Sequence, residues 1–124
     1  MPLEHEELTG NILAAAIEVH RALGPGFLES IYENALAIEF KKRKIAFERQ
    51  WSVKIFYDDF EVGTHRLDFL VSDAVVVELK AARALDPEHF VIVKSYLRAV
   101  DREHALLLNF SKPKLEARRV MARG

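Results

Sequence analysis

The chain has 124 residues, 50% of them hydrophobic and 30% charged, which predicts one globular domain spanning residues 1–124. The absence of cysteine excludes disulfide frameworks, thiolate metal sites and cysteine nucleophiles, and fits a cytoplasmic location. The formal net charge of -1 excludes a strongly basic coat for nucleic acid. Residues 1–8 are acidic and no long apolar run follows, so we expect no signal peptide and no membrane span.

Hydrophobic periodicity predicts two helices at the beginning of the chain. Apolar residues recur at helical spacing over residues 6–23, and a Gly-Pro-Gly segment (residues 24–26) then interrupts the pattern. A second helical pattern covers residues 28–44 and ends in a basic run at residues 41–44. Cations suit the C-terminal end of a helix dipole, but the same run would also suit contacts with phosphates, and both interpretations stay open.

The spacing then changes to the alternation that is typical of β-strands. It predicts a strand with one apolar face over residues 47–57 and, after an Asp-Asp turn, a partner strand over residues 60–71. Gly63 in the second strand is a candidate β-bulge. A continuous apolar run over residues 74–80 is typical of a central strand.

The remaining segments complete a mixed fold. An Asp-Pro-Glu start predicts a helix over residues 86–100, because aspartate caps helices well and proline fits their first turn. Two further strands are predicted over residues 104–110 and 115–121. The resulting order, ααβββαββ, predicts an α/β (α+β) fold in which helices flank a mixed sheet.

Charged residues lie on strands that should be buried. Glu78 and Lys80 are two residues apart at the end of an apolar run, so their side chains leave the same face of the strand. If this strand pairs with the preceding one, Asp68 comes close to Glu78. Two neighbouring carboxylates repel each other unless a cation compensates, and either Lys80 or a divalent metal ion would do so. A structural ion pair without chemistry is the alternative interpretation.

Glu29 adds a fourth charged group. It lies three residues before Tyr32 and seven before Leu36, on the predicted core-facing stripe of the second helix. A carboxylate in the first turn also stabilises the helix dipole, so a purely structural role stays open. Its coincidence with Asp68, Glu78 and Lys80 nevertheless indicates a site that is assembled from one helix and two strands.

The segment GFLESIY (residues 26–32) resembles the G-x-x-E-x-x-Y signature for which a family of small, mostly bacterial proteins is named. VHRALGPG (residues 19–26) and LLNF (residues 107–110) are similar to that family too, and the similarity covers residues 8–120. The GxxExxY family is placed in the PD-(D/E)xK nuclease-like superfamily. The resemblance implies a restriction-endonuclease-like fold, whose core is a helix, a three-stranded meander, a helix and a further strand.

The resemblance also implies roles for individual residues. Asp68 matches the first metal-binding acid of the superfamily, Glu78 and Lys80 match its E-x-K element, and Glu29 matches the acid from the helix before the meander. The backbone carbonyl of Leu79 is expected to complete the metal shell. Hard oxygen ligands of this kind suit Mg²⁺ or Mn²⁺.

Two positions depart from the family pattern. Leu67 stands where the superfamily name has proline, and Ile92 stands where the family usually has a glutamine, four residues before Tyr96. We expect a Mg²⁺- or Mn²⁺-dependent nuclease that hydrolyses phosphodiester bonds, with DNA as the expected substrate, although the residues do not separate DNA from RNA. The alternatives are a non-catalytic binding or regulatory module, which the isoleucine favours, and a hydrolase of a smaller phosphorylated substrate.

The end of the chain is locally basic. Lys112, Lys114, Arg118 and Arg119 could contact nucleic-acid phosphates, and a solvated strand and tail is the alternative interpretation. A chain of this length can span a duplex as a homodimer, but no pattern in the sequence indicates an interface.

Overall fold

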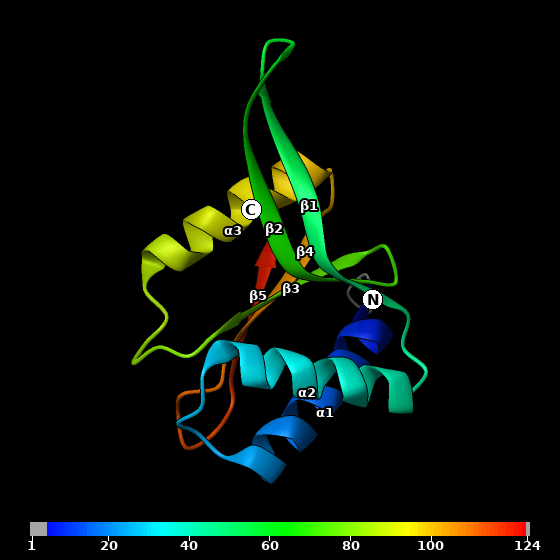
Figure 1. The fold of residues 1–124 in the computed structure, drawn as a ribbon, viewed down its shortest axis with the longest axis vertical. Coiled ribbons are helices and arrows are strands. Elements are labelled where there is room, and N and C mark those ends of the chain that lie inside the picture. Colours follow the sequence, from blue (N-terminus) through cyan, green and yellow to red (C-terminus); the bar gives the residue numbers. More distant parts are fainter. Residues whose placement is uncertain (1–4, 124) are drawn as a thin grey trace.

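A computed structural model of the protein describes residues 5–123. Residues 1–4, half of the acidic N-terminal segment, and Gly124 lie outside the described part of the predicted domain. The elements, shown in Figure 1, are α1 (Glu6–Leu23), α2 (Glu29–Lys42), β1 (Phe47–Tyr57), β2 (Phe60–Val71), β3 (Val75–Lys80), α3 (Pro87–Val100), β4 (His104–Asn109) and β5 (Glu116–Met121). The predicted order is confirmed.

The second helix is shorter than predicted and ends at Lys42. Lys44 adopts a left-handed conformation with φ of 58°, and the Ile45 N–H donates to the Phe40 carbonyl at 2.9 Å. This arrangement satisfies the last carbonyl groups of the helix and turns the chain toward β1. Hydrophobic periodicity does not predict this helix end, because lysine is not a typical residue at a position with left-handed backbone conformation.

The strands form one five-stranded sheet in the order β1-β2-β3-β4-β5. β3 and β4 are parallel, and the other neighbours are antiparallel. A parallel pair needs a crossover connection, which α3 supplies. Among residues 5–123 no helix is long and apolar enough to cross a bilayer.

The sheet separates two apolar cores. On one face α1 and α2 pack against residues that include Phe69, Val77 and Phe110. On the other face α3 packs through Val93 and Leu97 on side chains of β2, β3 and β4. Each strand of the centre of the sheet is therefore covered on both sides, which explains the continuous apolar runs of β3 and β4.

The β1–β2 hairpin projects beyond the rest of the sheet (Figure 1). β2 pairs with β3 only from Phe69 to Val71, so the outer part of the hairpin is a two-stranded ribbon. The pairing register shifts between Ile55 and Phe56, beside the partner residue Gly63, as expected for a bulge at this glycine. Phe56, Tyr57 and Phe60 are exposed near the tip.

The prediction of one apolar face along the first strand is wrong. Phe47 packs in the core beneath α1 and α2, whereas Val53 packs in the core beneath α3. The two strands of the hairpin exchange faces together, since Leu67 and Phe69 also lie in different cores. The exchange coincides with Gln50, whose φ of 49° interrupts the regular strand conformation.

Candidate functional site

Asp68 and Glu78 face each other where β2 and β3 separate. The last paired residues of the β2–β3 ladder, Phe69 and Val77, place Asp68 opposite Glu78. Here side chains replace the backbone ladder: the Leu79 N–H donates to Asp68 Oδ2 at 2.8 Å, and the Asp68 N–H donates to Glu78 Oε1 at 3.3 Å. The predicted proximity of the two acids is therefore present.

Burial raises the pKa of both carboxyl groups of the pair. Glu78 is only 6% exposed, and burial, reinforced by the charge of Asp68, raises its pKa to about 9. Burial also raises the pKa of Asp68, although the hydrogen bond from the Leu79 N–H opposes this rise. Protonated Glu78 donates to the Asp68 carboxylate through a side-chain hydrogen bond. A divalent cation held by Asp68 and Glu78 would neutralise their charge in place of that proton.

Lys80 and Glu29 complete the group of four predicted residues. Lys80 is half-buried at the end of β3, and its positive charge acts on the carboxyl groups of Glu29, Asp68 and Glu78. Glu29 is the first residue of α2; partial burial raises its pKa, Lys80 opposes the rise, and Asp68 adds to it. Within residues 5–123, however, no three Asp, Glu, His or Cys side chains are already arranged around one ion.

His65 and Tyr96 border the same site. Their rings stack with centroids 3.6 Å apart and planes 13° apart, and the buried His65 Nε2 has no hydrogen-bond partner within the described chain. Burial lowers the pKa of His65, and Asp68 opposes this change. Burial and then the charge of Glu78 raise the pKa of Tyr96.

The position of His65 follows from the exchange of faces in the hairpin. In a regular strand, residues three apart point to opposite sides, so the spacing from Asp68 argues against a common site. Because β2 changes faces between Leu67 and Phe69, the two side chains approach each other. No sequence signal other than an unexplained histidine could have indicated this.

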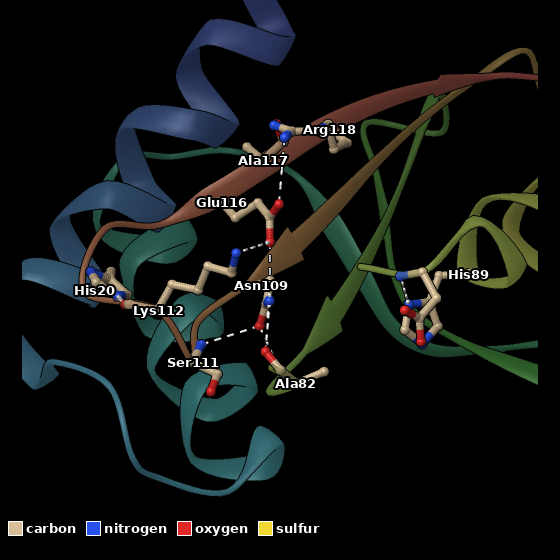
Figure 2. A network of polar contacts seen from close by, with 10 residues as sticks. His20, Ala82, His89, Asn109, Ser111, Lys112, Glu116, Ala117 and Arg118 are labelled. Carbon is tan, nitrogen blue, oxygen red and sulfur yellow. Dashed lines mark hydrogen bonds and ion pairs between the residues drawn. The ribbon is translucent and has the colours of Figure 1, made fainter. Parts of the chain in front are cut away.

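Asn109 fixes the segment that follows Lys80. The fully buried side chain donates to the Ala82 carbonyl at 2.8 Å and accepts from the Ala82 N–H at 3.1 Å. It also accepts from the Ser111 N–H at 3.2 Å and donates to Glu116 at 3.2 Å, as Figure 2 shows. The chain beyond β3 is thereby tied to β4 and β5.

The basic residues near the C-terminus do not gather on one face. Glu116 lies 3.8 Å from Lys112 and 3.4 Å from Arg118, so it offsets both cations (Figure 2). Arg118 pairs with Leu107, a residue of the α3 core, and Arg119 pairs with Leu106 of the other core. The two arginines therefore leave opposite faces of β5. Lys114 is exposed in the preceding loop.

The basic run at the end of α2 has local partners as well. Arg43 contacts Glu39 at 2.7 Å and Lys42 contacts it at 3.6 Å. Such i,i+3 and i,i+4 pairs are ordinary helix-stabilising contacts. The structure thus supplies a structural explanation for this run.

A protein-family model, that of the PD-(D/E)XK nuclease superfamily, matches residues 6–120 of the chain. The chain belongs to this superfamily. No curated protein matches the chain. The fold is similar to that of a solved structure described as the crystal structure of SSO0001, with a TM-score of 0.58 and 15% sequence identity over 94% of this chain and 59% of the other. The chain therefore spans about three-fifths of that protein, and at this identity the likeness concerns the fold alone.

Proposed function

We propose that the chain is a metal-dependent nuclease that hydrolyses phosphodiester bonds in nucleic acid, with DNA as the expected substrate. Membership of the PD-(D/E)XK nuclease superfamily supports a nuclease-type reaction. The observation that carries the proposal is the buried Asp68–Glu78 pair, which lies at the separation of two strands beside the ammonium group of Lys80. Buried groups with shifted pKa values are typical of functional sites.

We also infer membership of the GxxExxY family, since each position of that signature has a defined place. Gly26 has a φ of 112°, a conformation that glycine adopts most readily. Glu29 is the first residue of α2, and its carboxyl group is close enough to Lys80 and Asp68 to be affected by their charges. The hydroxyl group of Tyr32 donates to the Gly24 carbonyl at 2.6 Å and accepts from the Phe27 N–H at 3.1 Å. The tyrosine thereby holds the loop that presents Glu29.

The donor set fits Mg²⁺ or Mn²⁺. Two carboxyl groups, those of Asp68 and Glu78, lie together, and hard oxygen ligands are the ones these ions prefer. The Leu79 carbonyl and the carboxyl group of Glu29 would add further oxygen ligands, the latter through water. When bound, the ion would activate water and neutralise charge on the scissile phosphate.

The protein groups have separate tasks in this proposal. Asp68 and Glu78 would hold the ion, whose charge would stand in for the proton of Glu78 beside two close carboxylates. Lys80 stabilises the negative charge that grows on the phosphate as the bond to water forms. Glu29 orients water from the side of α2, while the basic residues Lys112, Lys114, Arg118 and Arg119 contribute at most long-range attraction for phosphates.

A non-catalytic nuclease-fold module is the second candidate. It is favoured by Ile92, an apolar residue on α3 that is 38% exposed in place of a polar side chain. Titration with Mn²⁺ separates the two: a catalytic site binds the ion and loses it in Asp68→Asn. A structural acid pair binds none, and the same substitution changes its stability alone.

The decisive experiment is a cleavage assay. The purified chain is incubated with single-stranded DNA, duplex DNA and RNA, each with Mg²⁺, Mn²⁺ or EDTA. We expect metal-dependent cleavage that Asp68→Asn and Lys80→Ala reduce by more than 100-fold, whereas Asp59→Asn, in the exposed hairpin turn, cleaves like the wild type. Equal cleavage by all four proteins would reject this assignment of the site.

A further inference from the structure

The tip of the β1–β2 hairpin (residues 57–60) exposes two aromatic rings that lie outside both cores. Tyr57 is 71% exposed and Phe60 is 72% exposed, and the two residues form the last pair of the hairpin ladder. Because paired residues of antiparallel strands leave the same face, both rings belong to one apolar surface. The last buried residue of β1 is Val53, so the tip extends about 13 Å past the core at about 3.3 Å per residue. Exposed aromatic surfaces of this kind are typical of protein–protein contacts.

The turn at the tip adds two carboxylates to the two rings. Asp58 and Asp59 are exposed, and no ion pair within residues 5–123 involves either of them. The next acid of the hairpin, Glu61, is offset by Lys54 at 3.8 Å. A surface with this charge repels the phosphate groups of nucleic acid. The chemistry of the tip therefore calls for a partner that combines an apolar surface with a cation.

A pocket elsewhere in the chain has both of these properties. It lies between α1 and the loop that joins β4 to β5, and its volume of about 410 Å³ is within the range of ligand-binding pockets. Its apolar lining comes from Ile17, Pro113 and Leu115, and Ile17 is 55% exposed although it is a large aliphatic residue. Arg21 and Lys114 line the same pocket and supply positive charge. We call it the basic pocket.

The walls of the basic pocket are fixed in the folded chain. The buried His20 of α1 donates a hydrogen bond from Nε2 to the Lys112 carbonyl at 2.8 Å, which ties the loop to the helix (Figure 2). Arg21 contacts Glu18 at 2.6 Å, and this contact offsets its charge. Lys114, by contrast, is exposed, and within the described part of the chain no hydrogen bond or ion pair engages it. The pocket therefore presents an uncompensated cation beside an apolar surface.

The tip and the basic pocket lie at opposite ends of the long axis of the chain, the tip in green and the β4–β5 loop in orange in Figure 1. The tip therefore does not reach the pocket of its own chain. We propose that the tip of each chain inserts into the basic pocket of a second copy, so that two chains form a reciprocal dimer. The two rings then cover the apolar lining, and the carboxylates of Asp58 and Asp59 approach Lys114. A two-fold axis beside the middle of the chain produces both contacts at once.

The area that such a dimer buries is sufficient for a specific contact. With exposures of 71% and 72%, each ring has on the order of 120 Å² left to bury. Two reciprocal insertions, counted on both partners, bury about 1,000 Å², which is the lower limit for a specific interface. We therefore expect weak association, with a Kd on the order of 1–100 µM. It requires neither a metal ion nor nucleic acid and is independent of the proposed function.

Two charge-reversed chains test the pairing of the tip with the pocket. The first chain carries Asp58→Lys with Asp59→Lys, and the second carries Lys114→Glu. Alone, each brings like charges together in a homodimer, which should raise Kd by about 30-fold or more. Mixed in equal amounts, the two chains should form a heterodimer with nearly the wild-type Kd, because every insertion then joins opposite charges. Lys44→Glu, an exposed lysine after α2 and outside the pocket, is the control and should dimerise like the wild type.

Sedimentation velocity in EDTA, at chain concentrations from about 1 µM to about 500 µM, measures the association. The melting temperature shows that each variant is folded, and it should change little because all the substituted residues are exposed. A further variant, Tyr57→Ser with Phe60→Ser, removes both rings. It should raise Kd by about 100-fold or more, since buried aromatic side chains dominate small interfaces.

The outcomes are separate from those of the cleavage assay. A wild type that stays monomeric, charge-reversed chains that still dimerise alone, or a mixture that does not associate would each overturn the proposal. If a monomeric wild type binds a fluorescein-labelled oligonucleotide and loses this binding with the two rings, the tip contacts nucleic acid instead. If the chain dimerises as expected but cleaves no nucleic acid, the proposed function is rejected and the dimer stands.

Discussion

Glu78→Gln is a direct test of the buried carboxyl pair. Glutamine has nearly the shape of a protonated glutamate: its carbonyl oxygen can accept from the Asp68 N–H, and its amide group can donate to the Asp68 carboxylate. The variant therefore imitates the protonated site at every pH. It removes only the requirement that a proton be held there.

The magnitude follows from the raised pKa. Glu78 has a pKa of about 9 in the folded chain and an ordinary value of 4.5, so between pH 6 and pH 8 it is ionised when unfolded and protonated when folded. The stability contributed by this proton is complete below pH 4.5 and is lost as the pH rises toward about 9. Each pH unit changes the free energy of unfolding by about 1.4 kcal/mol, or about 2.7 kcal/mol over two units.

Urea denaturation in EDTA at pH 6, 7 and 8 measures the effect. The free energy of unfolding of the wild type should fall by about 2.7 kcal/mol relative to that of Glu78→Gln across this range. The free energies of the two proteins must be compared at each pH, because His65 also titrates. The pKa of His65 is lowered by folding, so its contribution to the free energy of unfolding increases with pH up to about 6.5. Glu61→Gln, on the exposed hairpin, is the control and should run parallel to the wild type. If the difference in free energy of unfolding between the wild type and Glu78→Gln is independent of pH, the raised pKa of Glu78 is refuted.

Three further predictions concern the ion and the supports of the site. Mn²⁺ binding should release close to one proton at pH 7, and its affinity should increase about tenfold per pH unit, since the proton of Glu78 must leave. Calorimetry in two buffers of different ionisation enthalpy measures the number of protons released. Binding without proton release would contradict the prediction. Tyr32→Phe should lower the free energy of unfolding by about 1–3 kcal/mol, since it leaves the two loop groups bonded to this buried hydroxyl without a partner; an unchanged urea midpoint would show that the bonds are unimportant. Asn109→Ala should lower the free energy of unfolding by about 2–4 kcal/mol, because four hydrogen bonds are lost. It should also speed hydrogen exchange of the Ala82 amide. Protection of this amide as strong as in the wild type would argue against the anchoring role of Asn109.

The sequence predicted most of the fold because the spacing of its hydrophobic residues is regular within each helix and strand. The change from helical to alternating spacing located every element to within a few residues. Alternation with a short turn also brought Asp68 and Glu78 opposite each other, since a hairpin register leaves few choices. Helical spacing placed Glu29 on the stripe of Tyr32 and Leu36, but those two residues are buried whereas Glu29 is exposed at the first turn of α2.

The sequence could not predict what depends on single backbone angles. The left-handed Gln50, where the hairpin exchanges its faces, has no signal in a hydrophobic pattern, so the position of His65 could not be derived. The basic residues are a different case: Arg118 and Arg119 are consecutive on a strand, and alternation alone indicates that they point to opposite sides. That signal was present in the sequence.

The two residues of the carboxyl pair are close in the sequence, whereas the residues around the pair come from distant parts of the chain. Asp68 and Glu78 are ten residues apart on the antiparallel strands β2 and β3, whereas Glu29 and Tyr96 lie on helices that pack on the sheet from either side. Partial unfolding that lifts either helix would leave the two acids joined. The acid pair and the helices that cover it therefore have separate stabilities, and a loosened chain can keep the pair together after it has lost the surrounding groups.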